Sequence, residues 1–222
     1  MNKKEKYIII IQARLASKRF PAKILKKIKG VSAIEFLIRR LRNTNFSKSI
    51  WIATTLNPAD DVLVNKLKKK YNIFRGDEDD VLKRYYDLAK KLKAKNIIRI
   101  TSDCPFIDVD VINKGVSVYE KGNYDYVSNV LKRTFPDGLD TEIFSFKALE
   151  KANNSCKDIL MREHVTPFLR TGYQSKNITG NFKVQNFTNN YDFSHIRWTL
   201  DKRDDLDFLN SIAKHLKYNF KW

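Results

Sequence analysis

Cysteine and histidine, the residues that build disulfide frameworks and zinc sites, are scarce in this sequence of 222 residues. The two cysteines, Cys104 and Cys156, form no Cys-x-x-Cys pair, and two thiols cannot make a disulfide scaffold. The three histidines, His164, His195 and His215, lie far apart in the chain. We therefore expect no structural zinc site, and we interpret His164 as a structural histidine on a helix and the other two as surface or edge residues.

Long apolar runs are also absent. Residues 7–11 are apolar and follow a basic start, but this run is too short for a secretory signal and leads directly into Gln12 and Ala13. No stretch approaches the roughly 20 apolar residues that a membrane helix needs. We expect a cytoplasmic protein in a reducing compartment, with no membrane insertion.

Acidic residues are few relative to basic ones. Lysine and arginine number 43 against 25 aspartates and glutamates, which gives a formal net charge of +18. Such a surface could bind nucleic acid, an anionic membrane or small anionic substrates, whereas an A/T-rich coding sequence would enrich lysine without any ligand. Charge alone does not decide between an anion-binding role and a solvated lysine surface.

The chain does contain enough apolar residues for a core and a regular alternation of strand and helix patterns. Hydrophobic residues make up 42% and aromatic residues 12%, which argues against a disordered chain. Strands are predicted at 7–11, 49–54, 71–74, 96–101, 124–128, 139–146, 183–187 and 196–200, and helices near 31–41, 58–70, 81–92, 109–119, 147–153, 158–169 and 204–216. The alternation predicts an α/β fold, a mostly parallel twisted sheet with helices on both faces, in one domain over residues 1–222. Residues from about 135 to 190 break the alternation, so we expect an inserted hairpin or lobe there.

The loop after the first predicted strand, residues 12–23, concentrates four cations, namely Arg14, Lys18, Arg19 and Lys23. Loops at the carboxyl ends of parallel strands open into the crevice where ligands bind. Arginine forks, lysine ammonium groups and free backbone N–H groups all suit phosphate oxygens. The absence of Gly-x-x-x-x-Gly-Lys-Ser/Thr and Gly-x-Gly-x-x-Gly excludes a Walker loop and argues against a dinucleotide site. The alternative is a solvated basic loop.

Two aspartates are placed to meet that loop. Asp103 follows the predicted strand 96–101, and Asp201 follows the predicted strand 196–200. Carboxylates at such strand ends point into one crevice, where they could share a Mg²⁺ ion that also binds phosphate. The alternative for each is that it caps the following helix.

Other charged residues are candidates to bind an acceptor. Asp140 and Glu142 follow a Pro-x-Gly turn and could bind substrate hydroxyls, although turn chemistry explains the turn without a ligand. Lys132, Arg133 and Arg162 could meet a negative charge on the acceptor.

Six segments resemble, in order, the SpsF-like branch of the cytidylyltransferase family, whose relatives are the synthetases of CMP-Kdo and CMP-sialic acid. The patterns are IIIQAR-x-x-S-x-R-x-P-x-K-x-L within 8–25, RG-x-E-DDVL-x-RY within 74–85, R-x-T-x-DCP within 99–106, PDG-x-D-x-E-x-F within 135–144, REHVTP at 162–167 and R-x-T-x-D-x-x-x-DL at 197–206. Together they span almost the whole chain. Two positions depart from the family pattern, because Ala16 and Ala22 stand where members often carry glycine or a similarly small residue.

This resemblance implies a Rossmann-like nucleotidyltransferase fold and a homodimer. It implies transfer of CMP from CTP to an acceptor oxygen that attacks the α-phosphorus in line, with release of pyrophosphate. The catalytic residues it implies are Arg14, Lys23, Asp103 and Asp201, with Mg²⁺ held by the two aspartates. The nucleotide-binding residues it implies are Ala13, Arg14, Ser17, Arg19, Lys23, Thr54 and Arg75.

The acceptor stays open. We expect CTP and a small anionic acceptor, an acidic sugar or sugar-like molecule of surface polysaccharide or glycoconjugate biosynthesis. Within the enzyme class, the alternatives are a phosphorylated or phosphonate alcohol, or another NTP. From other classes, the alternatives are a basic nucleic-acid-binding module and a catalytically silent relative. No helix-turn-helix, RNP or zinc-finger pattern supports the nucleic-acid module, and the retained Arg14, Lys23, Asp103 and Asp201 weigh against the silent relative.

Overall fold

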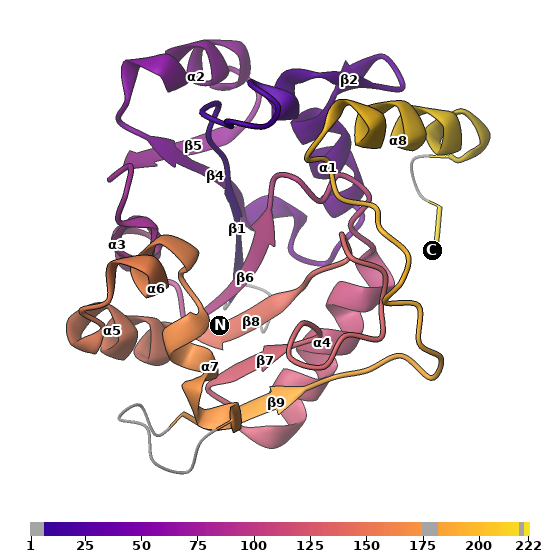
Figure 1. Cartoon of the computed structure of the whole chain (residues 1–222). Coiled ribbons are helices and arrows are strands. Elements are labelled where there is room, and N and C mark those ends of the chain that lie inside the picture. Colours follow the sequence, from indigo (N-terminus) through magenta and orange to yellow (C-terminus); the bar gives the residue numbers. More distant parts are fainter. Residues whose placement is uncertain (1–6, 175–181, 218–219) are drawn as a thin grey trace.

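A computed structural model describes residues 7–174, 182–217 and 220–222, and it is built around one seven-stranded sheet (Figure 1). The strand order is β5-β4-β1-β6-β8-β7-β9. The strands are β1 (Tyr7–Gln12), β4 (Ile50–Thr55), β5 (Asn72–Gly76), β6 (Asn96–Thr101), β7 (Tyr126–Ser128), β8 (Glu142–Ser145) and β9 (Val184–Asn186). Every pairing is parallel except those of β8 with β6 and β7. The predicted mostly parallel sheet is confirmed.

Helices cover both faces of the sheet because its central strand is apolar on both sides. Alternate residues of a strand face opposite ways, so Ile9 and Ile11 pack into one apolar cluster and Ile8 and Ile10 into another. The first cluster takes residues of α1 (Ala33–Leu41), α2 (Asp61–Leu67) and α4 (Val109–Gly122). The second takes residues of α3 (Val81–Lys91), α5 (Phe146–Ser155) and α7 (Pro167–Gln174). A strand buried on both faces is what the continuous apolar run predicts.

A third apolar cluster lies beside the sheet and supports the end of the chain. A small antiparallel pair, β2 (Lys27–Ile28) and β3 (Val31–Ser32), packs with α8 (Arg203–His215). Phe106 is fully buried in this cluster together with Leu209 of α8. Short 3₁₀ turns complete the described elements: η2 (Lys23–Leu25), η3 (Ser47–Ser49) and η4 (Pro58–Asp60). The cluster brings the segment before α8 next to the loop after β6.

The structure corrects three predicted elements. The predicted helix 158–169 is two helices, α6 (Ile159–His164) and α7, separated at Val165, which has φ 70° and ψ −57°. The predicted strand 196–200 is not a strand, since it makes only an isolated bridge between Arg197 and Asp137. The predicted strand 139–146 shortens to β8.

The segment 135–190 supplies two strands of the main sheet, β8 and β9, together with the helices α5, α6 and α7. In Figure 1 these three helices lie together on the side of α3. The division of the chain into domains stays a prediction. No helix in the described ranges is both long and apolar enough to span a bilayer.

The topology places a crevice at the carboxyl ends of β1 and β6. The chain runs from β1 outward through β4 to β5, and then crosses to β6 on the other side of β1. At such a reversal of strand order the loops after the two central strands diverge, and ligands bind between them. The N–H of Ser102 donates to the carbonyl of Gln12 (3.2 Å), which closes the base of the crevice.

Candidate active site

The loop after β1 folds back through its own backbone. The carbonyl of Leu15 accepts hydrogen bonds from the N–H groups of Ser17 (2.9 Å) and Ala22 (3.1 Å), and the Ser17 hydroxyl accepts one from the N–H of Phe20 (3.3 Å). Ala22 has φ 52° and ψ 29°, in the left-handed region that favours glycine. Ala16, the other departure from the glycine pattern, has no positive φ.

This loop presents unpaired backbone donors. Within the described part of the chain, four of its N–H groups donate no hydrogen bond, those of Arg14, Ala16, Lys18 and Arg19. Successive free N–H groups in a loop make a concavity that binds anions, and cationic side chains on the same loop strengthen it. The loop therefore has the chemistry of a phosphate cradle.

A cleft of about 710 Å³ opens over this loop. Its walls are formed by the loop, by residues 101–103 at the end of β6 and just after it, by Asp201, and by the ends of α3 and α6. A smaller hollow of about 140 Å³ shares none of these residues. That hollow lies beside Arg40, whose guanidinium already donates to the carbonyls of Ile107 (2.6 Å) and Phe220 (3.1 Å). The large cleft is the candidate active site.

Lys23 joins the two predicted aspartates in this cleft. Its Nζ lies 2.6 Å from Oδ1 of Asp201 and 3.4 Å from Oδ2 of Asp103. The N–H of Leu200 donates to the carbonyl of Asp103 (2.8 Å), which brings the two segments together. The loop after β1 and both carboxylates therefore meet, as the sequence predicts.

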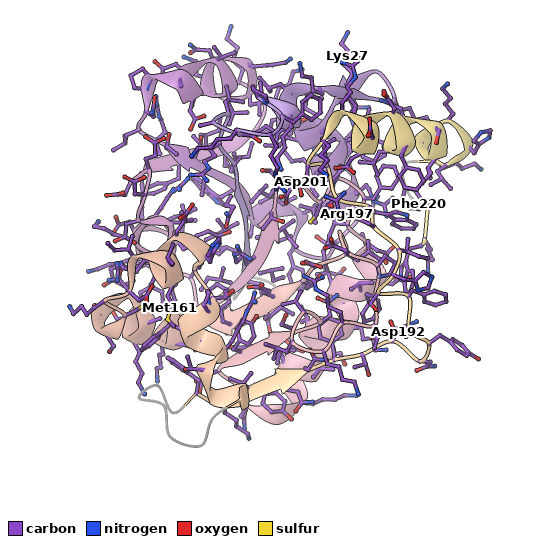
Figure 2. All side chains as sticks on the ribbon, in the orientation of Figure 1. Lys27, Met161, Asp192, Arg197, Asp201 and Phe220 are labelled. Atoms are coloured by element: carbon purple, nitrogen blue, oxygen red, sulfur yellow. The ribbon has the colours of Figure 1, made fainter. Side chains whose placement is uncertain are left out.

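The prediction that Asp201 ends a strand is wrong, although its position is right. Asp201 stands in the irregular segment that enters α8, and Figure 2 shows it beside Arg197 there. Neither aspartate caps a helix. Asp205 accepts from the N–H groups of Asp201 (2.7 Å) and Lys202 (2.8 Å) at the start of α8, while Asp108 caps α4. Both carboxylates are thus left to face the cleft.

Cations surround Asp201 and shift its ionisation. Besides Lys23, it pairs with Arg19 (3.3 Å) and Arg197 (2.9 Å). Burial alone would raise the pKa of Asp201, but the Lys23 hydrogen bond and the charges of the three cations outweigh it and hold the pKa below its usual value. Burial raises the pKa of the neighbouring thiol, Cys104, well above its usual value, which argues against a thiolate nucleophile.

The end of α6 forms the opposite wall, and sequence reasoning missed it. Glu163 pairs with Arg14 across the cleft (3.3 Å). Our interpretation of His164 as a structural histidine is wrong, because its side chain is exposed and lines the cleft. Val165, fully buried, adopts a positive φ in a tight turn that is closed by the N–H of Thr166 donating to the carbonyl of His164 (2.8 Å). Such a turn is strained for a β-branched residue, and strain of this kind gathers at functional sites.

Thr54 and Arg75, the predicted nucleoside contacts, do not line the cleft. The Thr54 hydroxyl is buried and donates to Asp60 (3.0 Å). Arg75 donates to the carbonyls of Thr55 (2.7 Å) and Asn57 (3.0 Å). Both residues hold the loop after β4 in place.

Two of the predicted acceptor residues form ion pairs outside the cleft. Glu142 is buried between Arg99 (3.2 Å) and Arg170, both of which pair with its carboxylate. Arg162 binds Asp80 (2.7 Å) and the carbonyl of Cys156 (2.8 Å). The structure corrects both expectations, since these side chains hold β8 and α6 in place rather than facing the cleft.

The remaining acceptor candidates form a network that leads away from Asp201. Arg197 reaches Asp137 (3.7 Å), and Arg133 binds Asp140 through two hydrogen bonds (2.7 and 2.9 Å) as well as Asp137 (3.4 Å). Lys132 is exposed beside them. None of these side chains lines the cleft itself, but Arg197 connects them directly to Asp201.

Sequence reasoning also missed Arg84 of α3 and Arg197. Arg84 is buried at the cleft wall, and burial lowers the pKa of its guanidinium. Both residues, like Glu163 and His164, fall within the segments that carry the family resemblance. That was the signal available for finding them.

Known proteins resemble the chain over nearly its full length. A sequence model of the family described as Cytidylyltransferase matches residues 8–219. The uncharacterized protein MJ1063 of Methanocaldococcus jannaschii is 36% identical over 211 residues, which are 95% of this chain and 84% of that protein. The spore coat polysaccharide biosynthesis protein SpsF of Bacillus subtilis is 26% identical over 215 residues, 92% of this chain and 85% of that protein.

Solved structures share the fold. A cytidylyltransferase from Leptospira borgpetersenii superposes with a TM-score of 0.89 at 33% identity, over 97% of this chain and 90% of that one. A CMP:2-keto-3-deoxy-manno-octonic acid synthetase, solved in complex with CTP, superposes with a TM-score of 0.67 at 14% identity, over 95% of this chain and 100% of that one. At that identity the second likeness concerns the fold alone.

Proposed function

Because this chain belongs to the cytidylyltransferase family and is a CTP-dependent nucleotidyltransferase, we propose that it joins CMP to a hydroxyl of an acidic sugar or sugar-like acceptor and releases pyrophosphate. The observation that carries the proposal is the contact of Lys23 with Asp103 and Asp201 beside the phosphate cradle. Nucleotidyl transfer, like other phosphoryl transfers, asks the protein mainly for positioning and charge stabilisation. A cationic loop and two carboxylates in one cleft supply both.

The triphosphate of CTP is proposed to lie in the loop after β1. The free N–H groups of Ala16, Lys18 and Arg19 would donate to its oxygens, and the Arg14 fork would bind them once it leaves Glu163. Ala13, Ser17 and Arg19 border the same cleft. The base would lie toward the wall that contains Arg84.

Magnesium is the cofactor that we propose, held by Asp103 and Asp201. The donor set fits, because the two carboxylates already flank a cation, the ammonium group of Lys23. No cluster of three or more His, Cys, Asp and Glu able to hold a metal occurs among the described residues. The other ligands would be water and phosphate oxygens, which Mg²⁺ prefers. When bound, Mg²⁺ neutralises phosphate charge, including the charge of the departing pyrophosphate.

In the proposed reaction, the acceptor hydroxyl gives its proton to water, its oxygen forms a bond to the α-phosphorus, and the bond between the α-phosphorus and pyrophosphate breaks. Lys23 and Arg14 would stabilise the negative charge that builds up on the leaving group. A contact of this kind that strengthens in the transition state typically contributes about 3 kcal/mol. The chain's own residues therefore act by orienting the triphosphate and stabilising charge.

An anionic acceptor is proposed from the cations that continue beyond the cleft. Arg197 and Arg133 form a chain of ion pairs that starts at Asp201, and Lys132 is exposed next to it. A carboxylate on the acceptor would exchange with Asp137 or Asp140 on these guanidinium groups. We further propose a homodimer, and a cytoplasmic role in surface polysaccharide or glycoconjugate biosynthesis, by analogy with the SpsF relative.

A pyrophosphate-release assay tests the proposal. The purified protein is incubated with Mg²⁺, each of the four NTPs in turn, and a panel of acidic sugars, neutral sugars, phospho-alcohols and phosphonate alcohols. We expect release with CTP and an acidic sugar only. Release with a phosphorylated or phosphonate alcohol, or with another NTP, would replace the acceptor or the nucleotide in the proposal. No release with any pair, together with salt-sensitive binding of nucleic acid, would favour a basic binding module instead.

A further inference from the structure

Asp60 is a buried carboxylate next to the phosphate cradle that the proposed mechanism does not use. It ends the short turn η4 after β4, and its residue is only 2% exposed. It does not line the cleft. A charged group is costly to bury unless it is fully hydrogen-bonded, so its bonding partners indicate its role.

Each oxygen of this carboxylate holds a different segment. Oδ2 accepts from the hydroxyls of Thr54 (3.0 Å) and Thr55 (2.5 Å) and from the N–H of Thr55 (3.3 Å), all at the end of β4. Oδ1 accepts from the N–H of Leu15 at 2.7 Å, in the middle of the loop after β1. Asp60 therefore ties the loop after β1 to the end of β4.

The Leu15 contact holds a residue that lies between two unpaired donors. Leu15 stands at a bend, where its carbonyl accepts from the N–H groups of Ser17 and Ala22 while its own N–H donates to Asp60, so both of its peptide groups are held. Arg14 and Ala16 both line the cleft, and their N–H groups donate no hydrogen bond to any described residue. The two donors are thus presented to a ligand.

Electrostatics argues against a direct contact between Asp60 and the triphosphate. A carboxylate close to a triphosphate repels it, and this repulsion is strong in a poorly solvated interior. The charge instead makes the bond to the Leu15 N–H short and firm, since charge-assisted hydrogen bonds are about twice as strong as neutral ones. A firm anchor keeps the loop N–H groups oriented before the ligand arrives.

We infer that Asp60 is the positioning residue of the triphosphate site: it fixes the Leu15 peptide so that the flanking N–H groups of Arg14 and Ala16 face the phosphates. This inference rests on the proposed function, because it assumes that the loop after β1 binds the triphosphate.

Three variants separate the Leu15 contact from the strand contacts. Asp60→Ala removes both. Asp60→Asn keeps an oxygen for the Leu15 N–H. The flipped amide would instead bring its NH₂ group against the Leu15 N–H, which lies at 2.7 Å, closer than the Thr55 N–H at 3.3 Å. Thr54→Val removes a strand-side hydrogen bond and leaves the Leu15 contact. Calorimetry measures the dissociation constants for CTP and for inorganic tripolyphosphate. Urea unfolding gives the midpoint of each variant, and NMR gives the amide proton shift of Leu15.

We expect Asp60→Ala to weaken tripolyphosphate binding at least about tenfold, a difference of 1.4 kcal/mol. Asp60→Asn and Thr54→Val should lose less affinity and stay within about threefold of the wild type, even where their urea midpoints fall. In both variants an oxygen still accepts from the Leu15 N–H, through a neutral and weaker bond in Asp60→Asn. In Asp60→Asn the Leu15 amide proton should move upfield, because its acceptor has lost its charge. In assays with turnover, Asp60→Ala should raise the KM for CTP more than it lowers kcat.

Three results would overturn the inference. They are an Asp60→Ala protein that binds tripolyphosphate as the wild type does, a Thr54→Val protein that loses about tenfold or more in affinity relative to the wild type, and a Leu15 amide shift that does not change in Asp60→Asn. The last two remain decisive if Asp60→Ala does not fold. A wild type that binds tripolyphosphate but releases no pyrophosphate from CTP would refute the proposed reaction alone. A wild type that binds neither anion would refute both.

Discussion

The ammonium group of Lys23 lies 2.6 Å from a carboxylate oxygen of Asp201, a residue 178 positions further along the chain. The same ammonium reaches Asp103 at 3.4 Å. Lys23 is the last cation of the loop after β1, so one side chain connects the cradle to both proposed metal ligands. A cation that binds both carboxylates must therefore compete with Lys23.

Replacing Lys23 by methionine should tighten metal binding in the absence of nucleotide. The Lys23→Met protein loses the ammonium that shares the two carboxylates, so Mn²⁺ should bind it more tightly than it binds the wild type, while turnover falls sharply. Electron paramagnetic resonance of free Mn²⁺ gives the affinity. Lys27→Met, which removes an exposed cation of β2, is the matched control and should change neither quantity. An unchanged Mn²⁺ affinity in Lys23→Met would separate Lys23 from the metal site.

Replacing Asp103 by alanine should abolish measurable turnover and leave the fold intact. Losing a group that stabilises charge in the transition state typically lowers kcat about 100- to 1000-fold. The fold should persist because the Asp103 side chain is 33% exposed and forms one ion pair, with Lys23. Pyrophosphate release and the thermal midpoint are measured together, with Asp207→Asn as an exposed-carboxylate control. Turnover of Asp103→Ala within a few-fold of the wild type would remove Asp103 from the mechanism.

The sequence predicts those parts of the fold that depend on local pattern. The apolar run at 7–11 and the strand at 96–101 correspond to β1 and β6. The segment 196–200 fails for a tertiary reason. Its apolar residues Trp198 and Leu200 pack into the third cluster without a neighbouring strand to complete a ladder. Local pattern shows that these residues are buried but not what they pair with.

The candidate site residues likewise include some that the sequence placed correctly and some that it misassigned. Lys23 and Asp103 were predicted to meet because the loops after neighbouring parallel strands open into one crevice. The same rule was applied to Asp201, but its segment is not a strand and is held there by the burial of Leu200 and by the bond from the Leu200 N–H to the Asp103 carbonyl. Glu142 was assigned to the acceptor because sequence shows a charge and a turn, but not that Arg99 stands directly opposite it in the sheet register. Arg162 was misassigned in the same way, because its partner Asp80 is 82 residues away. Sequence identifies which residues are charged, whereas only the fold shows which charges are already paired.

Replacing Glu142 by glutamine should therefore destabilise the protein and leave the acceptor KM unchanged. The substitution leaves Arg99 and Arg170 without their shared carboxylate, and breaking a buried ion pair in this way typically costs about 3–5 kcal/mol. Urea unfolding measures the loss, and an acceptor titration of the folded enzyme measures the KM. Full stability together with a raised acceptor KM would return Glu142 to the acceptor site.

The effect of Glu142→Gln should also depend on pH. Burial raises the pKa of Glu142, but the charges of Arg99 and Arg170 outweigh burial and hold the pKa below its usual value. A lowered carboxyl pKa stabilises the folded state fully above the unfolded value of about 4.3, and this contribution is lost as the pH falls through the lower folded pKa. The difference in unfolding free energy between wild type and Glu142→Gln should shrink below about pH 4. A difference in unfolding free energy that stays constant as the pH falls below about 4 would contradict an ionised Glu142 between Arg99 and Arg170.

Ala22 gives a prediction in the opposite direction, a substitution that stabilises. Its φ of 52° lies in the left-handed region, which costs a residue with a β-carbon about 1–2 kcal/mol. Glycine removes that strain but adds about 0.4–1 kcal/mol of unfolded-state entropy. Ala22→Gly should therefore raise the free energy of unfolding by about 0.5–1 kcal/mol. Ala16 lies in the same loop without a positive φ, so Ala16→Gly should gain no relief and lower the stability by about 0.4–1 kcal/mol. Urea unfolding of the two variants separates backbone strain from loop flexibility. If the free energy of unfolding falls in both variants, the left-handed conformation at Ala22 has no influence on stability.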